Sequence, residues 1–240
     1  MAKLPALVDA LAQHDPRGLA AVNHYARIVR EAGFLPTTKR GNGASDMGER
    51  EVVNLLLGLA EVTNAQKAPR AIKVLRDAKL VGPLPDHPDP IERLAGFELE
   101  GHLESLGDFL ECLVRNVSDG GYVLASEDAR QVFLLSEIIL KAPDYWDGHA
   151  IVRFNAGHKD ELSLTFYGLT DEANSLGQAD EDPADIFSSL NEESEVQKTQ
   201  FGLSFTVRIG AEVVSDLARC LRAQRKIAPR RRSSPQEITS

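Results

Sequence analysis

The stretch that most constrains the fold of this chain runs from residue 16 to residue 44. Its first half is an amphipathic helical pattern with an apolar stripe formed by Leu19, Val22, Ala26 and Val29. Gly33 follows where a glycine commonly ends a helix, because glycine takes a positive φ without strain. We therefore expect a helix that stops at Gly33 and continues as a short loop.

The loop after this helix is basic and rich in glycine. Lys39 and Arg40 lie between Gly33 and Gly41. One group of DNA-binding modules combines these two features: it binds a duplex with a helix in the major groove and an adjoining basic wing on the backbone. The order of these elements predicts an all-helical, winged helix-turn-helix DNA-binding module over residues 1–82.

Three further helices complete this predicted module. An apolar helical pattern over 4–13 precedes the helix that stops at Gly33. Asp15 and Pro16 read as the N-cap and first-turn residues of the helix that stops at Gly33. Asp46 is expected to start a third helix, with Glu49 completing a capping box. A fourth helix is expected over 68–80, with outward-facing side chains of Arg70, Lys73 and Arg76.

A proline cluster marks the expected end of the module. Residues 81–90 contain four prolines, and a new helical pattern follows Asp89. Its leucines recur every three or four residues, at Leu99, Leu103, Leu106, Leu110 and Leu113. We favour packing of this stripe in the core of its own domain, and a dimer seam is the alternative.

The second half of the chain predicts a small antiparallel sheet between helices. Residues 151–155 and 162–167 read as a hairpin, and 203–209 alternate apolar and polar residues. Periodicity does not decide between helix and strand for 128–140. A last helix is expected over 211–225. The fold class is thus α+β, with an acidic oligomerisation or effector domain at 89–225 and a disordered basic tail at 226–240.

Charge is distributed unevenly along the chain. The total of −9 divides into +4 for residues 1–80, −18 for 81–220 and +5 for 221–240. Because phosphate binding depends on local potential, a basic amino-terminal module on an acidic body is compatible with nucleic-acid binding. A plain solvated acidic surface is the alternative explanation of the charge pattern.

Side-chain chemistry suggests roles for the cations and amides of the module. Arg27 and Asn23 suit base edges, since guanidinium forks match guanine and amides match adenine. Arg17, Lys39 and Arg40 are expected to hold phosphates. Alternatively, the arginines form an ordinary solvated helix face and the glycines only form a turn.

The segment HYARIVREAGFLPTTKRGNG resembles the DNA-binding end of MerR-type regulators. His24 and Tyr25 lie in its helix, and Gly33-Phe34-Leu35-Pro36 forms the turn before the wing. The resemblance spans about 25 to 30 residues, and it adds His24 to the expected DNA contacts. The double aromatic pair of that family is reduced to one tyrosine, and the long carboxy-terminal coiled coil is missing. The whole chain is similar to uncharacterised proteins of temperate phages and prophages of alphaproteobacteria, which implies a mobile-element origin.

Other functional classes find little support in the sequence. The six histidines show no metal-ligand spacing, and no P-loop, HExxH or GxSxG motif occurs, so we expect no cofactor, no metal and no enzymatic activity. No run of 18 apolar residues exists, and Cys112 and Cys220 read as free thiols. We therefore expect a cytoplasmic protein without a membrane span.

Together these features predict a sequence-specific regulator of transcription that binds double-stranded DNA as a homodimer. The competing hypothesis is a phage packaging or assembly protein that acts through oligomerisation. In that case the basic loop is a structural turn, and the leucine stripe drives a ring.

Overall fold

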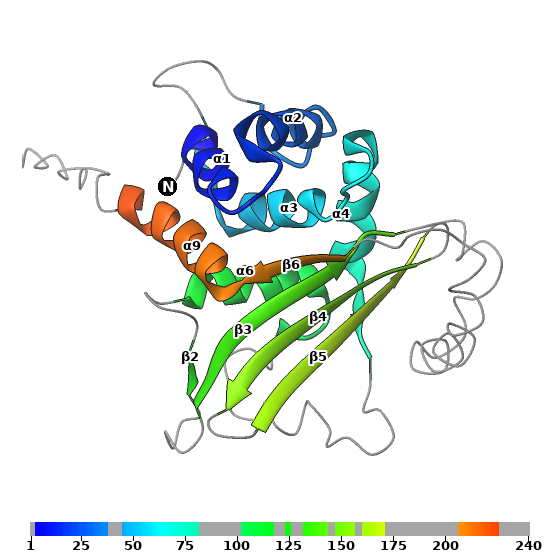
Figure 1. Cartoon of the computed structure of the whole chain (residues 1–240), viewed down its shortest axis with the longest axis vertical. Helices are drawn as coiled ribbons and strands as arrows, with labels where there is room; N and C mark the ends of the chain where they lie inside the picture. The colour runs from blue at the N-terminus through cyan, green and yellow to red at the C-terminus, as the bar shows by residue number, and fades with distance from the viewer. Residues whose placement is uncertain are drawn as a thin grey trace, which may run out of the picture.

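The computed structural model describes residues 3–37, 45–81, 102–117, 123–125, 132–143, 147–156, 160–170 and 206–225. The helices are α1 (Leu4–Ala12), α2 (Gly18–Glu31), α3 (Glu49–Leu59), the 3-10 helix η2 (Ala65–Lys67), α4 (Ala68–Asp77), α6 (Leu106–Asn116) and α9 (Ala211–Arg225). The strands are β1 (Lys79–Leu80), β2 (Val123–Ala125), β3 (Val132–Lys141), β4 (Asp147–Ala156), β5 (Asp160–Leu169) and β6 (Thr206–Gly210). Figure 1 shows the helices gathered at one side of the sheet.

The six strands form one antiparallel sheet in the order β1-β5-β4-β3-β2, with β6 paired to β3 beside β2. The predicted hairpin is confirmed as β4 and β5. The described part of the undecided segment 128–140 belongs to β3, which pairs with β4 along one edge and with β2 and β6 along the other. These pairings with distant segments make it a strand, which its own apolar run did not determine. The α+β class with a small antiparallel sheet is therefore confirmed.

Helix α3 lies at the centre of the helical layer. Every residue from Val52 to Leu59 is buried, including the polar Asn54. A helix that is apolar on all sides must be surrounded, and α3 packs against α2, α4, α6 and α9. Helices α4 and α9 pack on the strands, and α6 reaches the sheet through Phe109, whose ring contacts Phe154 and Phe166.

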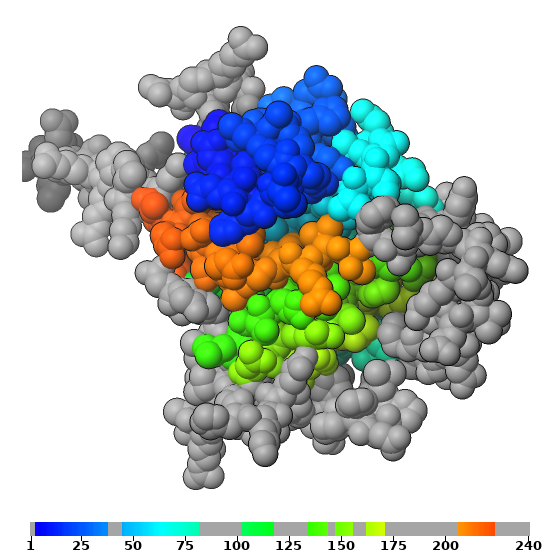
Figure 2. Space-filling view, in the orientation of Figure 1, coloured from blue at the N-terminus to red at the C-terminus, as the bar shows by residue number. Residues whose placement is uncertain are grey.

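One hydrophobic core contains residues from both halves of the chain. Leu7 of α1, Leu57 of α3, Phe166 of β5 and Leu217 of α9 all belong to the same buried cluster. Helix α1 packs on α9, and in Figure 2 the blue amino-terminal surface borders the orange surface of the last described residues. The units 1–82 and 89–225 predicted from the proline cluster thus share a core; the prolines themselves lie outside the described residues.

The leucine stripe belongs to this core. Leu106, Leu110 and Leu113 are buried within the chain on α6, and Leu103 packs against the core from a partly buried position. Leu99 lies outside the described residues. The three buried leucines are therefore not available as the dimer seam considered above, and core packing, the favoured interpretation, is confirmed.

Two predicted helix starts are corrected. Helix α3 begins at Glu49, after Gly48, because the carboxylate of Glu51 accepts a 2.7 Å hydrogen bond from the Gly48 amide. Asp46, the predicted cap, instead pairs with Lys3 at 2.9 Å. Helix α2 begins at Gly18, later than the Asp15–Pro16 pair indicated.

Arg76 does not point outward as predicted. Its guanidinium donates to Asn54 Oδ1 at 2.9 Å and pairs with Glu111 of α6. It therefore links α3, α4 and α6 beneath the surface. The helical pattern of the sequence places Arg76 on the polar side of α4. Helix α6 covers that side in the fold, and the local pattern contains no sign of this contact.

No helix within the described ranges is long and apolar enough to cross a membrane. Neither cysteine forms a disulfide, as predicted, and Cys112 is buried while Cys220 is partly buried. Burial and the nearby Asp216 carboxylate raise the pKa of the Cys220 thiol. The tail 226–240 lies outside the described part of the chain.

Candidate nucleic-acid interface

Helix α2 carries three of the six predicted DNA contacts, and its end follows the sequence prediction. Gly33 has φ of 86°, and its amide donates to Arg30 O at 3.0 Å. The Phe34 amide donates to Val29 O at 3.1 Å. This pair of bonds is a Schellman motif, which satisfies carbonyl groups that the helix end would leave unpaired. The helix therefore ends at Gly33, as predicted, before the loop that leads to Lys39 and Arg40 in the sequence.

The start of α2 is built differently from the prediction. Asp15 accepts a 2.9 Å hydrogen bond from the Arg17 amide, and Gly18 takes a φ of 77°. The carboxylate thus closes a tight turn two residues long, and the helix begins only after it. Asp15 organises the entry to α2 without being its N-cap.

The exposed face of α2 presents Asn23, His24 and Arg27. All three are solvent-exposed, whereas Tyr25 and Val29 on the opposite side are buried. Positions 23 and 27 lie one helical turn apart, and position 24 lies beside them. The structure therefore brings these three predicted site residues together on one surface.

The polar groups on this face make only weak contacts within the chain. Asn23 Nδ2 donates to Leu19 O at 3.0 Å, which uses one of the two amide hydrogens. Arg27 Nε lies 3.5 Å from Glu31 Oε1, and the Arg27 side chain remains 57% exposed. An exposed pair of this kind contributes at most about 1 kcal/mol, so a ligand can displace it.

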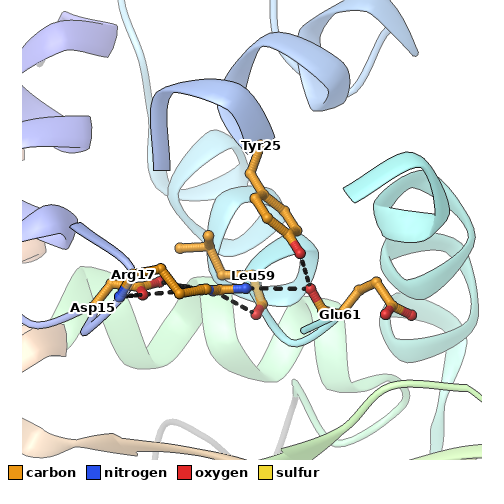
Figure 3. Close-up of polar contacts among 5 residues, drawn as sticks. All are labelled: Asp15, Arg17, Tyr25, Leu59 and Glu61. Atoms are coloured by element: carbon orange, nitrogen blue, oxygen red, sulfur yellow. Dashed lines mark hydrogen bonds and ion pairs between the residues drawn. The ribbon is translucent and has the colours of Figure 1, made fainter. Parts of the chain in front are cut away.

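Arg17 lies in the turn before α2, and its side chain points toward Leu59 and Glu61 at the end of α3, as Figure 3 shows. Its Nε and Nη2 donate to the Asp15 carboxylate, with Nη2 to Oδ2 at 2.7 Å. Nη2 also donates to Leu59 O at 3.0 Å, and Nη1 donates to Glu61 O at 3.4 Å. The guanidinium carbon sits 4.7 Å from the centre of the Tyr25 ring.

Asp15 and Arg17 each stabilise the charged form of the other. Burial by itself would raise the pKa of Asp15, but hydrogen bonds and attraction from Arg17 outweigh it, so this pKa lies below its usual value. The hydrogen bond to Asp15 raises the pKa of Arg17 against the opposing effect of burial. Burial also raises the pKa of Tyr25, which keeps its hydroxyl as the donor to Glu61 O.

These contacts give Arg17 a role within the fold. Its guanidinium is engaged by a carboxylate and two carbonyls, and its side chain is only 26% exposed. A phosphate would have to break this arrangement to reach it. Lys39 and Arg40, the other predicted phosphate contacts, lie outside the described residues.

Sequence reasoning missed three residues that shape this region. Tyr25 extends the apolar spacing of Val22 and Val29, so its burial was readable from the pattern. Glu31 lies one turn after Arg27, a spacing that signals an ion pair. Glu61 carries no local signal, because its contacts to Tyr25 and Arg17 arise only from the packing of α2 against the end of α3.

Among the described residues, no group of three or more His, Cys, Asp or Glu side chains lies together as a metal site would require. No family model, curated protein or solved structure matches this chain.

Proposed function

We propose that this protein is a sequence-specific regulator of transcription, of phage or mobile-element origin, that binds double-stranded DNA as a dimer without enzymatic activity. The observation that carries the proposal is the exposed face of α2. It gathers Asn23, His24 and Arg27, and in the sequence Lys39 and Arg40 follow within nine residues of the end of this helix.

The spacing of the polar groups on α2 suits the edges of base pairs. One turn separates Asn23 from Arg27, a rise of about 6 Å. Base pairs are stacked about 3.4 Å apart, so the two side chains would address neighbouring or next-nearest pairs. Asparagine pairs with adenine and arginine with guanine through two hydrogen bonds each.

Phosphate contacts are assigned in this proposal to Lys39 and Arg40, since Arg17 is engaged inside the fold. Each lost phosphate contact would weaken binding to all sequences and flatten the salt dependence by about one charge. A two-fold dimer would place two such helices on one operator. Its interface must lie away from the leucines of α6, which are buried within the chain.

The full-length chain is the right material for the test, because its amino-terminal helices share a core with the sheet. Selection from a random duplex library would identify a site, and fluorescence anisotropy would then measure affinity. Arg27→Ala should weaken binding about tenfold and relax the preference at one base pair.

Arg208→Ala is the matched control. Arg208 on β6 is exposed and paired with Glu137 at 3.3 Å, much as Arg27 is paired with Glu31. Its loss removes the same charge from a different surface and should change affinity little. If the full-length protein shows no salt-dependent DNA binding at low salt, or forms a large ring by light scattering, the proposal is overturned.

A further inference from the structure

We infer that Arg17 and Tyr25 are positioning residues that fix the orientation of α2 and thereby present its exposed face to a ligand. What that face binds rests on the proposed function. How the helix is held is a separate question, and it can be tested without any DNA.

The first support is the place of these side chains at the end of α3. Carbonyl groups at a helix end have no partner within the helix. Here Arg17 donates to Leu59 O and Glu61 O, and the Tyr25 hydroxyl donates to the same Glu61 oxygen (Figure 3). The donors belong to α2 and the turn before it, so each bond ties α2 to α3.

Glu61 extends this connection to the next helix. Its backbone oxygen receives the bonds from α2, while its carboxylate accepts from the amides of Thr63 at 2.8 Å and Asn64 at 3.1 Å. Glu61 is 5% exposed. One residue thus links α2 to the turn that leads into η2 and α4.

The far end of α2 is attached to α3 as well. Asn54, buried in the middle of α3, donates from Nδ2 to Phe34 O at 2.8 Å, on the last residue of the Schellman motif. Gly58 allows Val29 close to the α3 backbone, since a Cβ there would lie 3.0 Å from Val29 Cγ2. Helix α2 is therefore held at both ends by one buried helix.

The chemistry of the near attachment favours a fixed geometry. The planar guanidinium donates in several directions from one rigid group, and Asp15 on one side and the Tyr25 ring on another limit its rotation. A helix held in this way loses little freedom when a ligand binds, which favours affinity. A lysine would keep the positive charge but would lack the planar group with several N–H donors.

Hydrogen–deuterium exchange on the free full-length protein tests how α2 is held. Tyr25→Phe removes only the hydroxyl donor, and Arg17→Lys replaces the planar guanidinium with an ammonium group. Each should speed exchange of α2 amides by up to about tenfold, the effect of losing one buried hydrogen bond, while the centre of α3 remains protected. A uniform increase over all helices would mean general destabilisation and would overturn the inference, as would unchanged exchange.

Matched controls separate the local effect from the chemical change. Tyr167→Phe removes a hydroxyl from a buried tyrosine of β5, and Arg222→Lys alters an arginine of α9 that donates to Val117 O at the end of α6. Neither should alter exchange in α2.

DNA binding gives a second readout that distinguishes the two proposals. For Tyr25→Phe, affinity should fall while the slope of log affinity against log salt stays unchanged, because no phosphate contact is lost. If Arg17→Ala flattens that slope by about one charge, Arg17 contacts phosphate and its positioning role is wrong. If exchange changes as expected but the wild type binds no DNA, the proposed function fails while the positioning role stands.

Discussion

Arg17, just before α2, and Arg27, within α2, have the same side chain, yet their surroundings give them opposite roles. Arg17 is partly buried, and its partners include a carboxylate whose pKa it keeps low. Arg27 is mostly exposed and meets Glu31 only loosely. Removing a partner from a buried charge is costly, whereas an exposed pair is easily exchanged for another. The first arginine is suited to structure and the second to binding.

Glu31→Gln tests this contrast at the binding face. Loss of the carboxylate frees Arg27 and removes a negative charge that would repel phosphate, so affinity for the selected duplex should rise about two- to fivefold by anisotropy. Glu104→Gln, which removes an exposed carboxylate just before α6, should have a much smaller effect. Equal gains for both variants would show a general charge effect and argue against α2 as the contact surface.

At the scale of elements, α4 connects the helical layer to the sheet. Its chain continues directly into β1, which pairs with β5, and its backbone lies against β5 at Gly168. A Cβ at Gly168 would lie 2.5 Å from Val74 O, a distance that no side chain can occupy. The absence of a side chain at this strand position therefore sets how closely α4 approaches the sheet.

Gly168→Ala should force α4 and β5 apart. We expect the free energy of unfolding to fall by about 1–3 kcal/mol, measured as a lower urea midpoint with an unchanged slope. Ser163→Ala, at an exposed position of the same strand, should stay within about 0.5 kcal/mol of the wild type. A Gly168→Ala protein with the wild-type midpoint would show that the two elements can separate without loss.

For the whole molecule, the shared core has consequences for cooperativity. Helix α1 packs on α9, the last described helix, although the two come from opposite ends of the described chain. His14 after α1 also meets Asp216 of α9 at 2.9 Å. Helix α3 in turn packs on α6. Neither half buries its apolar surface without the other, so the two halves should unfold together.

The full-length chain should therefore unfold in a single urea transition. Far-ultraviolet circular dichroism, which reports mainly the helices, and exchange of the β4 and β5 amides, which reports the sheet, should give coincident midpoints. A fragment of residues 1–82 should lack a cooperative transition of its own. Two separate transitions would show that the amino-terminal helices form an independent domain.

Local interactions determine the features that the sequence predicted well. The stop of α2 at Gly33 depends on the φ of one residue and on bonds within a few positions. The hairpin of β4 and β5 and the helix over 211–225 follow from alternation and helical spacing in short windows. The exposed face with Asn23, His24 and Arg27 was readable for the same reason, since helix periodicity alone separates it from the buried side.

Tertiary packing decided what short-range patterns leave open. The pattern of β3 fits either helix or strand until β2, β4 and β6 pair with it. Arg17 and Arg76 look like surface cations until α3 and α6 supply carbonyl and carboxylate partners. The leucines of α6 suit a core or a seam equally, and burial by the other helices makes them core. Each outcome depends on groups distant in sequence, because desolvation and hydrogen-bond partners are properties of the assembled core.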